Sequence, residues 1–229
     1  VRLVGSEMCI RDRLPSGTML RTTALHPALR RATSAAPLVA ARAPFLGGVR
    51  TYRVPSLEEL AKRQDEYEAR VDECKKDIVK LGYLEQGIAR HEVIWGEHDQ
   101  FRHVNNVHYL RWFESARMEW VSLMAQELSP ELRNNIVEGR NVGMILAQTT
   151  CRYRRPVTFP DTVLIGQAVL PITMPDRFTL KYAAYSVAQR EVVALSEQLT
   201  VTYDYTHHRK ANIPEELRQA LEAWQYTGK

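Results

Sequence analysis

The second half of the chain is a succession of extended segments. In the last of them apolar residues recur at every second position, as expected for a strand with one buried face. The segments cover residues 142–153, 162–170, 177–187 and 192–205. Prolines separate the first three, and a turn at 188–191 joins the last two. We expect four consecutive antiparallel strands, preceded earlier in the chain by a strand at 90–95.

A long segment at 57–81 has the spacing of a helix, with apolar residues at every third or fourth position. Ser56 precedes it and Glu59 follows three residues later, which predicts a capping box at its start. The apolar stripe is narrow and the other faces are highly charged. Because such a helix gains its stability from packing, we expect it to pack within its own protein rather than on another partner.

A second helix follows at about 106–124, capped by Asn105 or Asn106. Its apolar residues extend around more than one face, so we expect burial over most of its circumference. A short third helix is expected at 213–224. One buried helix with consecutive antiparallel strands indicates an α+β fold, with the sheet wrapped round that helix.

Composition places the chain among ordinary globular proteins. It has 229 residues, of which 45% are apolar and 25% charged. No uncharged apolar run approaches the roughly 18 residues of a membrane span. Three scattered cysteines suit neither a disulfide framework nor a zinc site. No His, Cys or Asp spacing resembles a metal site and no glycine-rich phosphate loop occurs, so the sequence predicts no metal and no cofactor.

The net charge of +4 originates in residues 1–52, which hold eight arginines and two acidic residues. The remainder carries a net charge of −2 and gives no electrostatic case for a nucleic-acid partner. No acidic residue occurs from Arg13 to Leu57. This pattern resembles a mitochondrial presequence, with a basic tail as the alternative. We expect a presequence at 19–52 and a location in the mitochondrial matrix.

The first residues of the chain have a different character. Residues 1–18 contain a run, from Val4 to Arg13, that resembles a translated sequencing-adapter fragment. We therefore expect residues 1–18 to be an artefact of the gene model, with Met19 as the true start.

Side chains able to do chemistry crowd the connection between the strand at 90–95 and the next helix. Five ionisable groups lie there within seven positions: Glu97, His98, Asp99, Arg102 and His103. The free N–H groups at a helix start favour negative charge and polarise a carbonyl oxygen. A carboxylate beside that oxygen attacks the carbonyl or activates water. These are the parts needed to transfer an acyl group to water.

This connection resembles the signature of a known family, the 4-hydroxybenzoyl-CoA thioesterases of the hot-dog fold. The similar residues are Glu97-x-Asp99-x-x-x-His103-Val104-Asn105-Asn106-x-x-Tyr109-x-x-x-Phe113-Glu114-x-x-Arg117. The order of strand, motif, helix and four strands is also similar. The resemblance implies a hot-dog domain at 87–211, with a helical extension at 53–86 before it and a C-terminal helix and tail at 212–229.

The resemblance also implies catalytic roles. Asp99 falls at the catalytic carboxylate, which acts as nucleophile or general base on a thioester carbonyl. The backbone N–H of Asn106 falls at the oxyanion donor. His103 and Asn105 line the same turn and orient water, the thioester or the carboxylate, and Tyr109 is a supporting, substrate-binding position. The alternatives are structural: capping of the turn or helix by Asp99 and the asparagines, and hydrogen bonding by His103.

Two residues depart from the family pattern. Glu97 stands where Asp is common, and Arg102 stands where Gly is common. An arginine there requires a different turn, pairs with Asp99 and lowers its pKa, or reaches a CoA phosphate. The last alternative makes Arg102 a candidate substrate-binding residue. We expect His98 and His108 to take no part in the chemistry.

A sheet of this kind leaves one edge unpaired. The resemblance implies that a second subunit covers this edge, giving a homodimer or homotetramer with its site between subunits. Gln148 and Thr149 would then bind substrate opposite Asp99 of the partner subunit. Three arginines form a strip that either meets CoA phosphates or is a solvated strand face: Arg152, Arg154 and Arg155.

The leading functional hypothesis is a mitochondrial acyl-CoA thioesterase. The alternative is a non-catalytic hot-dog subunit that binds acyl groups or serves in a mitochondrial assembly. Arg102 and the charged helix at 57–81 support that alternative. A hydratase acting on enoyl-CoA is weaker, because that class has an Asp-x-Asn-x-x-His order, whereas Asp99 here precedes His103 by four positions. Either CoA or acyl carrier protein fits as the carrier.

Overall fold

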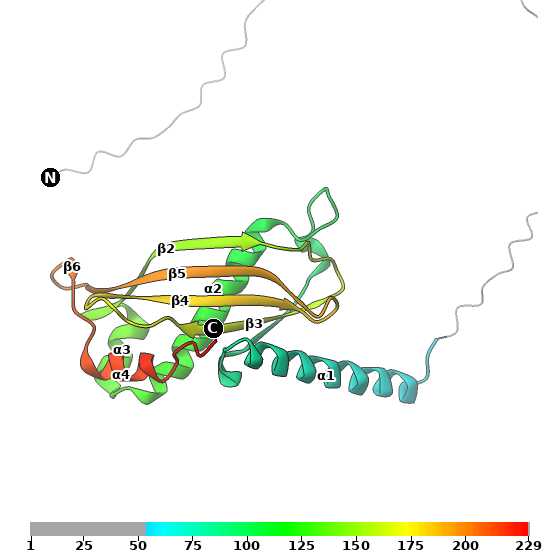
Figure 1. Ribbon diagram of the computed structural model, residues 1–229, viewed down its shortest axis with the longest axis horizontal. Helices are drawn as coiled ribbons and strands as arrows, with labels where there is room; N and C mark the ends of the chain where they lie inside the picture. The colour runs from blue at the N-terminus through cyan, green and yellow to red at the C-terminus, as the bar shows by residue number, and fades with distance from the viewer. Residues whose placement is uncertain (1–53, 229) are drawn as a thin grey trace, which may run out of the picture. The chain divides into compact units, whose positions relative to one another are not determined.

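One curled antiparallel sheet organises the chain (Figure 1). The computed structural model describes residues 54–228, so the expected presequence at 19–52 and the segment 1–18 lie outside the described residues. The strand order is β1–β3–β4–β5–β2, and β6 pairs with β5. The strands are β1 (Ala89–Glu92), β2 (Val142–Tyr153), β3 (Thr162–Val169), β4 (Arg177–Ser186), β5 (Glu191–Asp204) and β6 (Arg209–Lys210). The four consecutive antiparallel strands are therefore confirmed.

Helices and short 3-10 turns make up the rest of the regular structure in residues 54–228. The α-helices are α1 (Leu57–Lys80), α2 (Asn106–Met124), α3 (Pro130–Glu138) and α4 (Glu215–Glu222). The 3-10 turns are η1 (Glu85–Gly87), η2 (Trp95–Glu97) and η3 (Ala125–Glu127). Helix α3 was not expected from the sequence. In the described part of the chain, no helix has both the length and the hydropathy to cross a bilayer.

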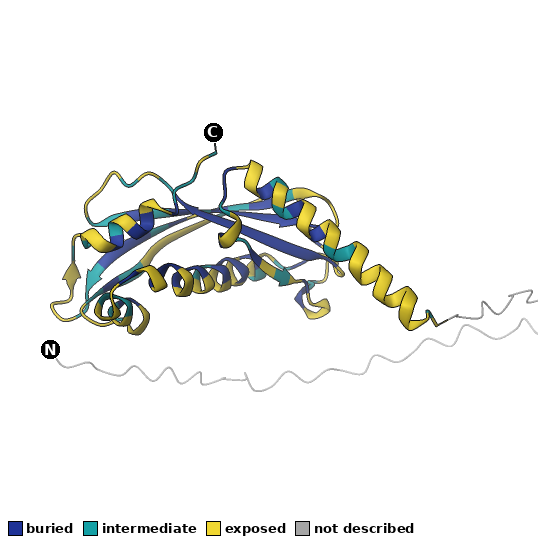
Figure 2. Ribbon diagram, turned by 90° about the horizontal axis from the view of Figure 1, so that it is seen from below, coloured by how far each residue is buried: buried dark blue, intermediate teal, exposed yellow. Residues whose placement is uncertain are grey.

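Helix α2 crosses one face of the sheet and forms the first core with it (Figure 2). Seven of its residues are buried: Tyr109, Trp112, Phe113, Ala116, Trp120, Val121 and Met124. Its other side carries exposed apolar residues: Val107, Leu110, Met118 and Leu123. The expectation of burial over most of the circumference is therefore wrong for the single chain, because the sheet covers only one side of the helix.

Helix α1 packs on the opposite face of the sheet, against β3 and β4 (Figure 2). The expected capping box of Ser56 and Glu59 is present at its start. Val71, Cys74 and Ile78 are fully buried and form a second core with residues of the sheet. This confirms that the helix packs within its own protein. Every residue of β3 is buried, because helices cover both of its faces.

A glycine allows α1 to approach β3 closely. A Cβ added at Gly166 would lie 2.6 Å from Ile78 Cγ2 and 2.9 Å from Tyr83 Cγ. A side chain larger than hydrogen at this position therefore displaces either the helix or the tyrosine that follows it.

Strand β2 forms the far edge of the sheet. It pairs with β5, and within residues 54–228 its other side has no strand partner. The pairing shifts between Leu146 and Gln148, where a bulge interrupts the strand, and residues 146–150 are exposed. The unpaired edge expected from the sequence is therefore present.

Candidate active site

The loop before α2 closes into a tight turn around Asp99. The Asp99 N–H donates to the His103 carbonyl at 2.9 Å, and the Arg102 N–H donates to the Asp99 carbonyl at 3.1 Å. The Phe101 N–H donates to Asp99 Oδ1 at 2.7 Å, which orients the carboxylate. The second carboxylate oxygen, Oδ2, has no hydrogen-bond partner among residues 54–228, and so it remains available to a ligand.

Arg102 occupies the one position in this turn with a left-handed backbone. Its φ of +64° is in the region that favours glycine, because a Cβ there crowds the backbone. This backbone conformation explains why glycine is common at the position of Arg102 in the family that the motif resembles. Arg102 is exposed and, among the described residues, forms no ion pair with Asp99. The alternative in which it pairs with Asp99 is therefore not what the structure shows.

Helix α2 begins at the end of this turn with Asn105 as its cap. The Asn105 side chain accepts the Val107 N–H at 3.2 Å, and its backbone N–H donates to the Glu97 carbonyl at 2.9 Å. Asn106 is the first helical residue. Its own N–H finds no acceptor among residues 54–228, as expected for the first turn of a helix. One positively polarised donor therefore remains available at the helix start.

Glu97 holds the loop to α2 rather than facing the cleft. Its buried carboxylate accepts the Ile94 N–H at 2.9 Å and the Trp112 indole N–H at 2.9 Å, and it lies 3.2 Å from His91 Nε2. Burial alone would raise the pKa of Glu97. The hydrogen bonds from Ile94 and Trp112 and the proximity of His91 outweigh burial and hold the pKa below 4.5. The acid at this position is therefore a structural anchor.

Asp99 and the helix start line one open cleft of about 550 Å³. Four residues proposed from the sequence meet there, namely Asp99, His103, Asn106 and Tyr109. The other lining residues are Phe101, Val104, Tyr153, Arg154, Arg155 and Pro156. Within the single chain, Asn105, Arg102, Gln148 and Thr149 do not line the cleft. Among the described residues, no group of three or more His, Cys, Asp or Glu side chains is placed to hold a metal ion.

Tyr153 is the most informative residue of the cleft that sequence reasoning missed. Its hydroxyl donates to the Asn106 carbonyl at 3.0 Å, and its ring meets Tyr109 edge-on at 5.2 Å. The end of β2 is thereby joined to the start of α2. Burial raises the pKa of both Tyr109 and Tyr153 to about 12, which keeps the hydroxyls protonated. No local pattern indicates this contact, since it joins residues 47 positions apart.

The remaining candidates lie elsewhere. Gln148 and Thr149 are exposed in the middle of β2, and Thr149 lines a separate cavity of about 200 Å³ beside Arg117. Their proposed role opposite a second subunit stays a prediction. His98 Nε2 accepts the Phe159 N–H at 2.7 Å, and His108 Nδ1 lies 3.7 Å from Glu97. Both histidines have structural partners outside the cleft.

Comparison with known families identifies the class of protein. The sequence model of the thioesterase-like superfamily matches residues 93–221, which is more than half of the chain. The chain therefore belongs to the thioesterase-like superfamily. The matched range contains the turn at Asp99, α2 and all but the last residue of α4, and α1 lies before it. A search of curated proteins finds no match.

Solved structures share the architecture. The PA5185 protein from Pseudomonas aeruginosa strain PAO1 is 26% identical, with a TM-score of 0.54, covering 66% of this chain and 97% of that one. A 1,4-dihydroxy-2-naphthoyl-CoA thioesterase from Synechocystis is 18% identical, with a TM-score of 0.50 and coverages of 58% and 93%. A DHNA-CoA thioesterase from Staphylococcus aureus is 16% identical, with a TM-score of 0.50 and coverages of 59% and 88%. These likenesses confirm the expected α+β hot-dog fold.

Proposed function

We propose that the protein hydrolyses an acyl-CoA thioester to a carboxylic acid and CoA. The observation that carries this proposal is the cleft, in which the Asp99 carboxylate and the Asn106 N–H face the same space. Among residues 54–228, Asp99 Oδ2 accepts no hydrogen bond and the Asn106 N–H donates none, so both remain available to a substrate. Membership of the thioesterase-like superfamily supports the same chemistry.

The helix start supplies the electrostatic part of the reaction. The thioester carbonyl oxygen accepts a hydrogen bond from the Asn106 N–H, where the dipole of α2 stabilises developing negative charge. This donor is preorganised, because the Asn105 cap fixes the backbone on one side and the Tyr153 hydroxyl fixes the Asn106 carbonyl on the other. The hydrogen bond from the Asn106 N–H to the carbonyl oxygen is therefore strongest in the transition state, when that oxygen carries the most negative charge.

Asp99 supplies the nucleophilic part by one of two routes. In the first, a carboxylate oxygen bonds to the carbonyl carbon and the C–S bond breaks, leaving an acyl–Asp99 anhydride that water then opens. In the second, Asp99 takes a proton from a water molecule whose oxygen bonds to the carbonyl carbon. In both, CoA leaves as a thiolate and takes a proton from solvent. His103 lies in the same cleft and orients the attacking water.

Hydrolysis of a panel of acyl-CoA thioesters by the purified protein, followed as released thiol, tests this proposal. We expect Asp99→Asn to lose about 10²- to 10⁴-fold in kcat while keeping its thermal midpoint. Asp65→Asn, an exposed aspartate of α1, is the matched control and keeps full activity. Equal activity in Asp99→Asn refutes the assigned role. A protein that hydrolyses no thioester but co-purifies with other chains is the non-catalytic subunit of the alternative hypothesis.

We further propose that two chains associate along β2. The unpaired β2 edge and the exposed apolar face of α2 support this arrangement. Gln148 and Thr149 lie on that edge, where they would approach Asp99 of the partner subunit. Sedimentation equilibrium gives the oligomeric state, and a monomer at micromolar concentration contradicts the proposal.

We also propose import into the mitochondrial matrix. The acid-free, arginine-rich segment up to Leu57 supports it. Fusing residues 19–57 to a fluorescent protein tests the signal directly. Fluorescence confined to mitochondria is expected, and diffuse fluorescence contradicts the proposal.

A further inference from the structure

Large apolar side chains are exposed on the loop between β1 and α2, which projects beside the start of α2 (Figure 1). Ile94, Trp95 and Phe101 are 61%, 73% and 69% exposed, and Phe159, on the segment that leads to β3, is 44% exposed. We call these four residues the apolar rim. Large apolar side chains that gather at one end of a molecule are typical of a surface with a partner.

Hydrogen bonds hold the loop and the segment before β3 side by side. The Val93 N–H donates to the Asp161 carbonyl at 2.9 Å, and the Phe159 N–H donates to His98 Nε2 at 2.7 Å. The two segments that carry the apolar rim are therefore joined to each other, and its members form one surface rather than scattered exposed residues.

Trp95 extends outward from a turn that is fixed from within. The buried Glu97 carboxylate of the same turn accepts the Ile94 N–H at 2.9 Å and the Trp112 indole N–H at 2.9 Å. These bonds anchor the backbone of η2 to α2, while the side chains of Ile94 and Trp95 face solvent. A hydrogen-bonded turn thus presents the apolar side chains, which favours a surface already shaped for its partner.

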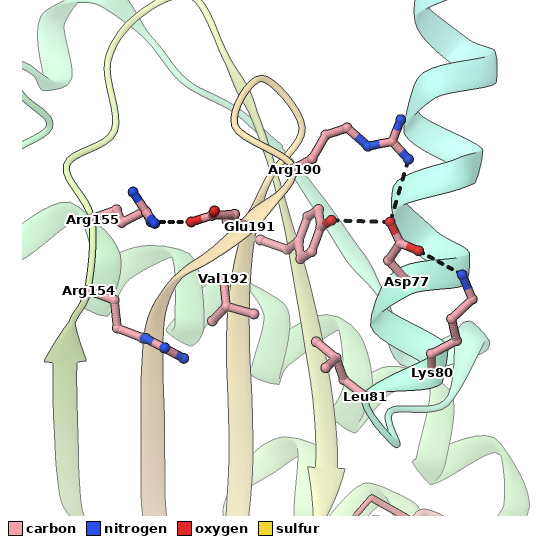
Figure 3. Close-up of a pocket in the computed structure, with 9 residues that line it drawn as sticks. Asp77, Lys80, Leu81, Arg154, Arg155, Arg190, Glu191 and Val192 are labelled. Carbon is pink, nitrogen blue, oxygen red and sulfur yellow. Dashed lines mark hydrogen bonds and ion pairs between the residues drawn. The ribbon is translucent and has the colours of Figure 1, made fainter.

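Unpaired cations accompany the apolar rim. Arg102 follows Phe101 and is exposed. Arg154 lines the same cleft as Phe101, and with Arg155 it also lines a groove beside the last turn of α1 (Figure 3). There Arg155 pairs with Glu191, whereas Arg154 and Arg102 have no carboxylate partner among residues 54–228. The surface around the rim is therefore apolar and positively charged.

A bilayer that contains anionic lipids matches this surface. Aromatic side chains settle at the level of the lipid headgroups, and cationic side chains beside them are attracted to anionic lipids. The two carboxylates of the loop are the buried Glu97 and the half-buried Asp99, so little negative charge opposes such a surface.

A second copy of the chain fits the apolar rim less well. We expect the second copy along β2, at one edge of the sheet. Ile94 and Trp95 follow β1, which forms the opposite edge. Pairing along β2 therefore leaves this part of the rim in solvent.

We propose that the apolar rim docks the protein onto the surface of an anionic lipid bilayer. Trp95 and Phe101 enter the headgroup region, and Arg102 and Arg154 bind lipid phosphates. This peripheral binding goes beyond thioester hydrolysis. As a consequence, the mouth of the Asp99 cleft lies at the bilayer, where long-chain acyl thioesters partition. That consequence rests on the proposed function, whereas the docking itself does not.

Intrinsic fluorescence reports the docking directly, because one of the four tryptophans, Trp95, is exposed and the other three are at most 7% exposed. We expect the emission to shift to shorter wavelength when vesicles of equal parts phosphatidylcholine and phosphatidylglycerol are added. Trp95→Phe should abolish the shift while the protein still sediments with the vesicles. An unchanged spectrum, with the protein left in the supernatant, overturns the proposal.

Co-sedimentation of variants with the same vesicles tests the two parts of the surface. We expect Trp95→Ser and Phe101→Ser each to lower the partition coefficient about tenfold. Arg102→Gln should lower it about fivefold, with no effect on vesicles of phosphatidylcholine alone. Val137→Ser is the matched control, because Val137 is 62% exposed but lies on α3, outside the rim. Equal partitioning of all variants contradicts the proposal.

Sedimentation equilibrium without lipid distinguishes the bilayer from a second copy of the chain. If Trp95→Ser is monomeric where the unsubstituted protein is dimeric, the apolar rim is a protein interface and the proposal fails. Hydrolysis of a water-soluble, short-chain acyl-CoA is a separate readout, and Trp95→Ser should keep its kcat because Trp95 does not line the cleft. Vesicle binding without any thioester hydrolysis refutes the proposed function and leaves the docking standing, and hydrolysis without vesicle binding does the reverse.

Discussion

The close approach of α1 to β3 makes Gly166 the most sensitive glycine for a test of the docked helix. In Gly166→Ala the added methyl would lie 2.6 Å from Ile78 Cγ2 and 2.9 Å from Tyr83 Cγ. Contacts below 3 Å force a displacement, and overpacking of this kind typically costs about 1–3 kcal/mol. For a domain of this size, that cost corresponds to a fall in the thermal midpoint of about 3–10 °C.

The strain is expected to shift α1 rather than release it. Val71, Cys74 and Ile78, on the side of the helix that faces the sheet, are fully buried, and exposing all three costs roughly 4–6 kcal/mol. This exceeds the overpacking cost, so the helix stays docked and opens more often. We therefore expect unchanged helicity by circular dichroism but faster amide exchange in α1.

Gly96 provides the matched control for this substitution. A Cβ at Gly96 meets nothing within 4 Å, so Gly96→Ala should change the free energy of unfolding by less than about 0.5 kcal/mol. If both variants unfold at the same temperature, α1 does not pack on β3 as described. Loss of the exchange difference in α1 would lead to the same conclusion.

Three further substitutions address the loop and its anchors. Arg102→Gly relieves a left-handed backbone at φ +64° and is expected to raise the thermal midpoint by about 2 °C; a fall in calorimetry contradicts this. Tyr153→Phe removes the hydrogen bond to the Asn106 carbonyl, worth about 1 kcal/mol, and should lower kcat/KM about fivefold; an unchanged value shows that the hydroxyl does not position the helix start. Because the pKa of Glu97 is lowered in the folded chain, its ionised form stabilises the fold above pH 4.5, and this contribution is lost as the pH falls through the folded value. Glu97→Gln should therefore lower the free energy of unfolding, measured with urea, most above pH 4.5 and less below it. A difference between the two proteins that grows as the pH falls contradicts a lowered pKa of Glu97.

Local patterns predicted most of the regular structure, because they depend on short-range chemistry. The capping box at Ser56 and the cap at Asn105 are readable from neighbouring residues. Helix α3 was missed, although Pro130 at its start and Gly139 with φ +65° after its end provide the usual signals. The partial exposure of α2 was missed because periodicity does not indicate whether one sheet or two layers cover a helix.

The cleft was predictable where it follows the motif and not where it depends on distant pairing. Asp99, His103, Asn106 and Tyr109 meet because they occupy one turn and the helix it precedes. Tyr153 reaches the same cleft through the path of β2 along β5, which no neighbouring residue specifies. The surface groove that is lined by the last turn of α1 and by Arg154 joins residues more than 70 positions apart, a relation that only the folded chain reveals.

The burial of Cys74, between α1 and the sheet, gives the protein an internal chemical reporter. Its thiol is fully covered, and burial raises its pKa, so reagents that require a thiolate react with it only after the helix lifts away. In the regime where reclosing outpaces labelling, the rate of modification measures the opening equilibrium itself. A substitution that loosens the docking of α1 then becomes measurable as faster alkylation of Cys74.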